Sequence, residues 1–237
     1  MAMEHTLIIG GSRGIGFATA QQLLQAGHRV TVSGLTAESA GRAAQQLGER
    51  AAAIALDLKD RAHLPDAIAG LGPLDHLVVA ASCDVAWGAF DALKMDAVLA
   101  ALNMKLIGYL AAVQVALPTL AARGSITFLG GAAGRFAMPG TVGLAAVNGA
   151  LEAATRTLAK EIAPRRVNLV SPGLTLTEAY AQMPEAQRTQ MFANAAAHLP
   201  ARKTGEPHEI AAAVTLCVTN RFVTGSVFDV DGGARLT

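Results

Sequence analysis

The segment Leu7–Gly16 constrains the fold of this chain more than any other. Its sequence, LIIGGSRGIG, joins a short apolar run to a cluster of glycines, and a helical pattern follows it. In such a segment Gly10 allows a tight turn, Gly14 lets the backbone approach a pyrophosphate, and Gly16 allows a helix to pack closely on a strand. A lone glycine cluster is often only a turn, but this one begins a series of strand–helix units. We therefore interpret it as the phosphate-binding turn of a dinucleotide site.

The rest of the chain repeats this alternation of strand and helix. Apolar runs predict strands at Thr6–Ile9, Arg29–Ser33, Ala51–Leu56, His76–Ala80, Ser125–Leu129, Val167–Val170 and Val227–Val230. Helical patterns cover Gly14–Ala26, Glu38–Leu47, Arg61–Ala69, Asp96–Leu120 and Thr141–Ala163. Short buried strands joined by helices imply right-handed crossovers. We expect an α/β fold of the Rossmann type, doubly wound, with a mostly parallel sheet and helices on both faces.

Length and composition fit one domain spanning residues 1–237. Hydrophobic residues make up 52% and charged residues 16% of the 237, which is typical of a globular chain. The net charge of +1 and the absence of a basic block give no support for nucleic-acid binding. We also expect no membrane segment, because the apolar stretch Tyr109–Ala122 is short and is interrupted by Gln114 and Pro118.

The cysteines and the N-terminus suggest a cytoplasmic protein. Cys83 and Cys217 are far apart and have no metal-ligand spacing, so we expect no metal site, and two cysteines suit a reducing compartment. The first residues lead directly into the first strand, and we see no signal peptide there.

Residues 174–207 form the longest departure from the alternating pattern. The segment contains Pro184, Pro200 and Pro207, and it follows the carboxyl end of a predicted strand. Ligands bind at that end of open α/β sheets, so we interpret the segment as a lid over the substrate. The alternative is a surface insertion without a role in binding.

Several separated motifs occur in a fixed order along the chain. They are Gly10-x-x-x-Gly14-x-Gly16, Asp57 after the third strand, Leu158-Ala-Lys-Glu161, Val167-Asn168-x-x-x-Pro172-Gly173-x-x-x-Thr177, and Asp231-Gly-Gly233. With these motifs the chain resembles a short-chain dehydrogenase/reductase of the single-domain kind, over nearly its whole length.

The resemblance implies a cofactor site built from several turns. The residues that it implies are Gly10, Ser12, Arg13, Gly14, Ile15 and Gly16 in the phosphate turn, Ser33 at the end of the second strand, Asp57 and Leu58 beside the adenine, Ala80, Ala81 and Ser82 after the fourth strand, and Pro172, Gly173, Thr175 and Thr177 near the nicotinamide and phosphates. From the residues alone, Asp57 also fits an Asx-turn and Pro172-Gly173 a simple turn.

Charge decides which dinucleotide we expect. The second strand ends Val32-Ser33-Gly34-Leu35-Thr36, and no carboxylate follows until Glu38. An acidic residue there would bind a ribose 2′-hydroxyl and repel a 2′-phosphate. Arg13 instead offers a charge-assisted donor to that phosphate, so NADP(H) is the expected cofactor. The alternative is that Arg13 is a solvated surface charge.

The catalytic pattern of the resembled family is missing. Its tyrosine falls on Leu144, its lysine on Asn148, its serine on Gly131 and its asparagine on Lys105. Leucine has no proton to donate and glycine has no hydroxyl, so the usual mechanism cannot operate. The turn after the fourth strand is altered as well, to Val79-Ala80-Ala81-Ser82.

Lys105 and Asn148 suggest a compensation, because the lysine and asparagine positions have exchanged residue types. In the resembled fold these positions face each other across the cleft. We hypothesise that Lys105 clamps the cofactor and is also a candidate proton donor, while Asn148 supplies hydrogen bonds. The alternative is that Lys105 points to solvent from an exposed helix face.

Other candidate proton donors have simpler structural interpretations. Tyr180 fits a lid contact, Tyr109 a core or interface position, and Cys83 an inert small residue. We expect His198 to be exposed on the lid and Glu152 to lie outside the cleft.

Two functions remain open from the sequence. The first is an NADPH-dependent oxidoreductase acting on a small carbonyl compound, an alcohol or a quinone-like substrate with a non-standard proton source. The second is an NADPH-binding sensor without turnover, and a non-redox use of the cofactor is a weaker third. The resemblance further implies a homodimer or homotetramer.

Overall fold

The structure is a computed structural model that describes residues 3–82 and 85–237. Its centre is one seven-stranded sheet with the strand order β3-β2-β1-β4-β5-β6-β7, and every pairing between neighbouring strands is parallel. The strands are β1 His5–Ile9, β2 Arg29–Gly34, β3 Ala51–Ala55, β4 Leu74–Val79, β5 Leu120–Leu129, β6 Arg166–Pro172 and β7 Val227–Val230. The predicted Rossmann-type fold is confirmed, and the sheet is fully parallel where we expected a mostly parallel one.

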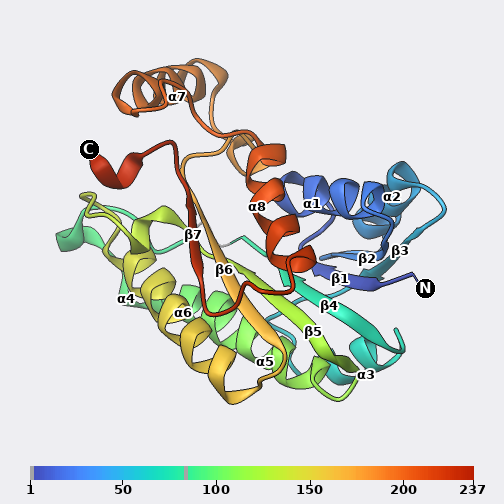
Figure 1. The fold of residues 1–237 in the computed structure, drawn as a ribbon. Coiled ribbons are helices and arrows are strands. Elements are labelled where there is room, and N and C mark those ends of the chain that lie inside the picture. Colours follow the sequence, from blue (N-terminus) through green and yellow to red (C-terminus); the bar gives the residue numbers. More distant parts are fainter. Residues whose placement is uncertain (1–2, 83–84) are drawn as a thin grey trace.

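Helices cover both faces of the sheet (Figure 1). The helices α1, α2 and α8 lie on one face, and α3, α4, α5 and α6 lie on the other. Their bounds are α1 Gly14–Gln25, α2 Ala37–Leu47, α3 Leu64–Ala69, α4 Met95–Ala101, α5 Gly108–Ala116, α6 Val142–Glu161, α7 Glu185–His198 and α8 Pro207–Thr219. Single turns occur at η1 Phe90–Ala92, η3 Ala132–Gly134, η4 Glu178–Tyr180 and η5 Ala234–Leu236.

Each face of the sheet has its own apolar core. Toward α5 and α6, Leu77, Tyr109 and Phe128 are fully buried. Toward α1 and α8, Ile8, Leu23 and Ile210 are fully buried. A strand buried on both faces needs apolar residues at successive positions, and this is why the strand segments are nearly continuous apolar runs.

Helix α7 stands apart from the body of the molecule (Figure 1). It and α8 were not predicted, although both lie in or after the proline-containing segment. For α8 the sequence does carry a signal: Pro207 occupies the first turn, and the Glu206 backbone N–H donates to Glu209 Oε2 at 2.9 Å. Proline in the first turn and glutamate at the third position are typical of a helix start.

The predicted long helix Asp96–Leu120 is wrong in its bounds and in its regularity. It is divided into α4, a π-helical segment η2 (Leu102–Ile107) and α5, and it ends at Ala116. Strand β5 begins at Leu120, five residues before the predicted Ser125. The Ala-Ala-Arg-Gly sequence after Leu120 is typical of a turn, and pairing of Leu120 with Leu74 on β4 overrides that preference.

The stretch Met95–Ala116 is also long and apolar enough to cross a membrane, judged by length and composition alone. In this fold its inner side packs on the sheet, where Tyr109, Ala112 and Ala116 are fully buried. Its outer side leaves Met95 and Leu99 more than half exposed. The apolar composition therefore serves helix–sheet packing and leaves an apolar outer face.

Candidate active site

The candidate site lies at the carboxyl edge of the sheet, where the strand order reverses between β1 and β4. Gly10 directly follows β1 there with a φ of +81°, and a Cβ on it would lie 2.7 Å from the backbone nitrogen of Ala81. Only glycine allows both this conformation and this approach of the two turns. Crevices at such a switch point are the usual ligand sites of open α/β sheets.

The turn between β1 and α1 presents backbone N–H groups. Gly14 has a φ of +55°, and a Cβ on Gly16 would lie 2.2 Å from the Gly10 carbonyl oxygen. Helix α1 begins without a capping side chain or an acidic residue in its first turn. Uncapped N–H groups at a helix start, such as that of Ile15, are donors of the kind that binds phosphate, and Glu178 Oε2 lies 3.4 Å from a Cβ placed on Gly14.

The end of β2 lies beside this turn. The Gly10 N–H donates to Ser33 Oγ at 3.0 Å, and Ser33 is buried. A Cβ on Gly34 would lie 3.3 Å from Ser12 Cβ, so Ser12 adjoins the same strand end. Arg13 immediately precedes α1 and is exposed, and its guanidinium has no hydrogen bond or ion pair within the described part of the chain. The structure thus places Arg13 at the predicted turn, with its guanidinium in solvent.

Asp57 and Leu58 follow β3 and differ in exposure. The exposed Asp57 accepts a hydrogen bond from the Lys59 N–H at 2.9 Å. This contact forms the Asx-turn that the sequence analysis gave as an alternative for Asp57. Leu58 is buried, and a Cβ on Gly108 would lie 2.9 Å from its Cβ. Just after β4, Ala80 is buried, Ala81 contacts Gly10, and Ser82 is exposed.

The segment from Pro172 to Thr177 closes the other side of the crevice. A Cβ on Gly173 would lie 2.7 Å from Asp231 Cα, so this glycine lets β6 approach the turn after β7. Thr175 is buried and donates its hydroxyl to the Gly173 carbonyl at 3.0 Å. Thr177 lies near Gly14, since a Cβ on that glycine would lie 3.5 Å from Thr177 Cγ2. The structure thus brings the segment predicted for the nicotinamide and phosphates against the phosphate turn.

Lys105 points into the site and not to solvent. It lies in the π-helical segment η2 and is partly buried, and its Nζ donates a hydrogen bond to the Gly130 carbonyl oxygen at 2.8 Å. Gly130 directly follows β5, at the carboxyl edge of the sheet. The alternative of a solvated Lys105 is therefore wrong, and the Gly130 carbonyl is a partner that sequence reasoning did not identify.

Asn148 lies beside Gly131, at which we predicted the serine position of the family. It is only 5% exposed on α6, and a Cβ on Gly131 would lie 3.0 Å from its Nδ2. Its Oδ1 is buried and has no hydrogen-bond partner among the described residues. A buried amide oxygen without a partner is unfavourable, so this atom suits a donor supplied by a ligand. Leu144, one turn earlier on α6, is partly buried.

The other candidate proton donors have structural contacts. Tyr109 is fully buried and donates to the Ala81 carbonyl at 2.7 Å, as a core residue does. The Tyr180 ring packs edge-on against Phe192 with centroids 5.3 Å apart, and burial raises the pKa of its hydroxyl. His198 is exposed, as expected. Tyr180 is thus a lid contact in this structure.

Glu152 is buried and ion-paired, a role that sequence analysis did not predict. Arg135, just after η3, contacts Glu152 at 3.2 Å and Asp229 on β7 at 3.1 Å. This pairing ties α6 to β7, one helical turn beyond Asn148. Neither cysteine is shown as a nucleophile: Cys83 lies outside the described residues, and burial raises the pKa of Cys217 to about 12.

A cavity of about 600 Å³ opens between the segment after β6 and α7. Its lining includes Thr177 and Glu178, which adjoin the phosphate turn, and Phe192 of α7. The cavity thus connects the long segment 174–207 with the carboxyl edge of the sheet.

Comparison with known proteins agrees with this geometry. A family profile described as enoyl-(acyl carrier protein) reductase matches residues 10–235. The zebrafish Danio rerio carbonyl reductase family member 4 is 32% identical, with 97% of each chain covered. The chain belongs to the short-chain dehydrogenase/reductase family. Its relatives in this family are named reductases and dehydrogenases, which places the chain among the oxidoreductases.

Other members of the short-chain dehydrogenase/reductase family are similar to this chain in sequence or in structure. The 3-oxoacyl-[acyl-carrier-protein] reductase of Mus musculus is 31% identical, with 97% of each chain covered. A small-chain dehydrogenase solved in complex with NADPH is 35% identical with a TM-score of 0.88 and full coverage of both chains. The Pseudomonas aeruginosa RhlG/NADP complex is 28% identical with a TM-score of 0.89, covering 99% of this chain and 97% of that one.

Proposed function

We propose that this protein is an NADP(H)-dependent reductase of a small carbonyl or quinone-like compound in which Lys105 replaces the usual lysine and tyrosine. The observation that carries the proposal is the 2.8 Å hydrogen bond from Lys105 Nζ to the Gly130 carbonyl, beside Gly131 and Asn148. It directs a cationic group toward the part of the site where the family's catalytic residues are absent.

The residues present fit a dinucleotide phosphate. The uncapped start of α1 and the glycines at positions 10, 14 and 16 provide the phosphate turn. Arg13, with its exposed guanidinium, would pair with a 2′-phosphate, and no acidic side chain follows β2 before Glu38. The unpartnered Asn148 Oδ1 would accept a hydroxyl donor from the nicotinamide ribose. The NADPH and NADP complexes of related structures support the same cofactor.

The chemistry of the site follows from its remaining polar groups. A bound nicotinamide would supply the hydride. Lys105 holds protons at Nζ and would stabilise the substrate oxygen as it gains negative charge, then donate a proton to it. Leu144 and Gly131 contribute no donor, so we expect substrates with a strong electron sink, which need less acid assistance.

Residues 174–207 would act as the lid over this substrate. The cavity between Thr177 and α7 supports this role, because it adjoins the phosphate turn and is partly lined by the apolar side chains Leu176 and Phe192. The protein would work as a homodimer or homotetramer, with the exposed apolar residues of α4 and α6 in the interface.

A sensor without turnover is the second candidate function. The loss of all four usual catalytic residues, at Lys105, Gly131, Leu144 and Asn148, favours it. Such a protein would bind NADPH through the same turns and would not transfer its hydride to any acceptor.

Calorimetric titration with NADPH and with NADH, followed by NADPH oxidation assays with quinones and conjugated carbonyls, tests the proposal. We expect NADPH to bind in preference to NADH and to be oxidised by at least one acceptor. The variant Lys105→Met should weaken NADPH binding roughly tenfold and lower turnover, because it removes a charged hydrogen-bond donor.

The matched control is Lys160→Met, which removes an exposed lysine from the last turn of α6. It should change neither binding nor turnover. Failure to bind either nucleotide would overturn both candidate functions. Tight NADPH binding with no oxidation by any acceptor would favour the sensor, and equal behaviour of both lysine variants would remove Lys105 from the mechanism.

A further inference from the structure

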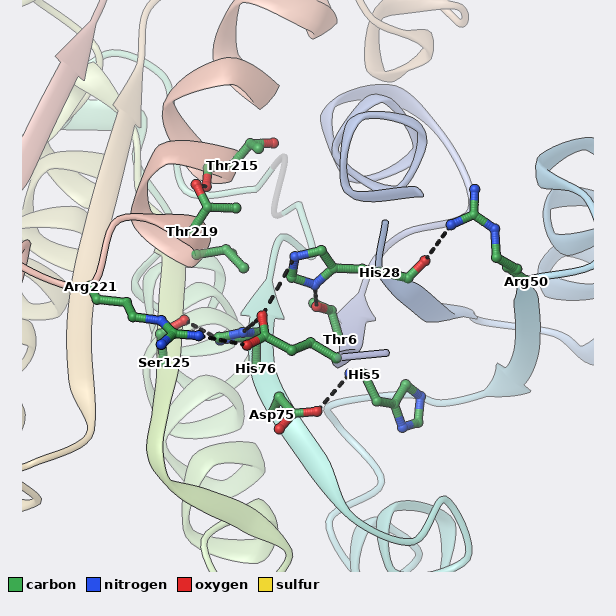
Figure 2. Close-up of polar contacts among 12 residues, drawn as sticks. His5, Thr6, His28, Arg50, Asp75, His76, Ser125, Thr215, Thr219 and Arg221 are labelled. Carbon is green, nitrogen blue, oxygen red and sulfur yellow. Dashed lines mark hydrogen bonds and ion pairs between the residues drawn. The ribbon is translucent and has the colours of Figure 1, made fainter. Parts of the chain in front are cut away.

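The opposite edge of the sheet carries a second cluster of polar side chains, far from the candidate active site. Glu4 precedes β1, His28 precedes β2, and His76 lies near the start of β4. Figure 2 shows His28 and His76 among the amino ends of the strands, with Ser125 and Arg221 close by. Because β2, β1 and β4 are neighbours in a parallel sheet, residues far apart in sequence meet at this edge.

One carboxylate oxygen of Glu4 lies close to a ring nitrogen of both histidines. Glu4 Oε2 lies 3.2 Å from His76 Nε2 and 3.7 Å from His28 Nε2. All three atoms lie within 4.8 Å of one another. Zinc–ligand bonds of about 2.0–2.1 Å place neighbouring ligand atoms of a tetrahedron about 3.3 Å apart. The distances from Glu4 Oε2 to the two ring nitrogens are therefore close to the edge of a zinc tetrahedron, and the two nitrogens lie no more than 4.8 Å apart.

The other ring nitrogens already have the partners that metal-bound histidines have. His76 Nδ1 lies 2.8 Å from Ser125 Oγ, and His28 Nδ1 lies 3.3 Å from Thr6 Oγ1. These contacts hold the ring orientations, and a hydroxyl oxygen can accept from Nδ1–H, the tautomer in which Nε2 is able to bind a cation. Both histidines are 5% exposed, and burial lowers the pKa of each, which favours the neutral form of imidazole that binds a metal.

We propose that Glu4, His28 and His76 form a zinc-binding site at the amino edge of the sheet, with the fourth position taken by water. Two imidazoles and one carboxylate are a ligand set that Zn²⁺ accepts, and water completes the tetrahedron. The side chain of Glu4 is 39% exposed, which gives the ion a route to the buried nitrogens. A zinc ion there would join the starts of three strands and stabilise the fold.

Arg221 is a charged group that opposes a cation at this place. Its Nη2 lies 3.2 Å from Glu4 Oε1, the carboxylate oxygen that the histidines do not contact. The guanidinium side chain is 84% exposed. It can therefore hold the outer oxygen in place while Oε2 binds the metal, and its charge lowers the affinity of the site.

Titration of the intact, tag-free protein with ZnCl₂ after treatment with a chelator tests the proposal, with Co²⁺ absorption as a report of four-coordinate geometry. We expect one equivalent of Zn²⁺ to bind and to raise Tm. Glu4→Gln and His76→Gln should each weaken binding by about tenfold or more, since each removes a ligand. Arg221→Gln should strengthen binding because it removes the opposing charge.

The matched control is His208→Gln, which alters an exposed histidine 3.3 Å from Glu206. Its zinc affinity should equal that of the wild type. Glu4 lies at the surface, so its variant tests the site even where a histidine variant fails to fold. The proposal is wrong when wild-type protein binds no more Zn²⁺ than the Glu4→Gln variant, or when His208→Gln removes the binding.

Discussion

Two separate constraints require glycine at position 10. Its φ is +81°, and a Cβ placed on it would lie 2.7 Å from the backbone nitrogen of Ala81. We expect Gly10→Ala to lower the free energy of unfolding by about 3 kcal/mol, because the left-handed conformation costs roughly 1–2 kcal/mol and the close contact adds to it. Urea denaturation measures the change.

Gly27 separates the two contributions. Its φ is +92°, but nothing lies within 4 Å of a Cβ placed there. Gly27→Ala should therefore cost only the conformational part, roughly 1–2 kcal/mol. An equal loss of stability in both variants would contradict the argument that the Ala81 contact matters.

At this scale the sequence predicted some side chains well and others not at all. The place of Lys105 in the family pattern predicted that its side chain points into the cleft. The 2.8 Å hydrogen bond from its Nζ to the Gly130 carbonyl agrees with that prediction. The meeting of Glu4, His28 and His76 could not be predicted from spacing, because it depends on which strands are neighbours. The pairing of Glu152 with Arg135 depends in the same way on tertiary contact.

Among the elements, α8 owes part of its anchorage to one buried side chain. Arg166 on β6 donates to the carbonyl oxygens of Cys217 at 2.6 Å, Val218 at 2.7 Å and Val223 at 3.0 Å. The first two belong to the last turn of α8, where carbonyls lack helical partners and attract a cation.

We expect Arg166→Lys to lower the free energy of unfolding by about 2 kcal/mol, because a single ammonium cannot reproduce the forked donor geometry and leaves carbonyls without a partner. Thermal or urea unfolding provides the measurement. Arg156→Lys, at an exposed position on α6, is the matched control and should change stability little. Equal stability of the two variants would show that the Arg166 contacts do not anchor α8.

Element bounds were predictable where periodicity was strong and failed where tertiary structure decided. The strands β1, β2 and β3 begin and end within one residue of expectation. Helix α7 was not predicted, because residues 174–207 depart from the alternating pattern of strands and helices and were interpreted only as a lid. The π-helical turn at η2 has no sequence signal that distinguishes it from an ordinary helix.

For the whole molecule, the outer side of α4 and α6 predicts self-association. Met95 and Leu99 on α4 are 59% and 57% exposed, and Val142 on α6 is 51% exposed. We expect a mass of two or four times 24.3 kDa by light scattering. Leu99→Lys should shift the protein toward the monomer, because a charge within a buried apolar contact is unfavourable.

Leu35→Lys is the control for this experiment. Leu35 follows β2 and is 75% exposed. In the sheet, β1 and β4 separate β2 from β5 and β6, so Leu35 lies away from α6. Its variant should keep the wild-type mass. A wild-type mass of 24.3 kDa would contradict the expected assembly.

The π-helical segment Leu102–Ile107 also allows chain length to vary inside a helix. A π turn holds one residue more than the α-helical turn it replaces. The segment therefore turns the chain about as far as an α-helix one residue shorter, and losing one of its six residues would leave α4 and α5 in nearly the same relative rotation. Such a deletion would shift the residues of the turn itself, Lys105 among them, while Leu99 on α4 would keep its outward direction. In a lineage of such proteins, a single-codon insertion or deletion at this turn would change the chemistry of the crevice without changing the subunit contact.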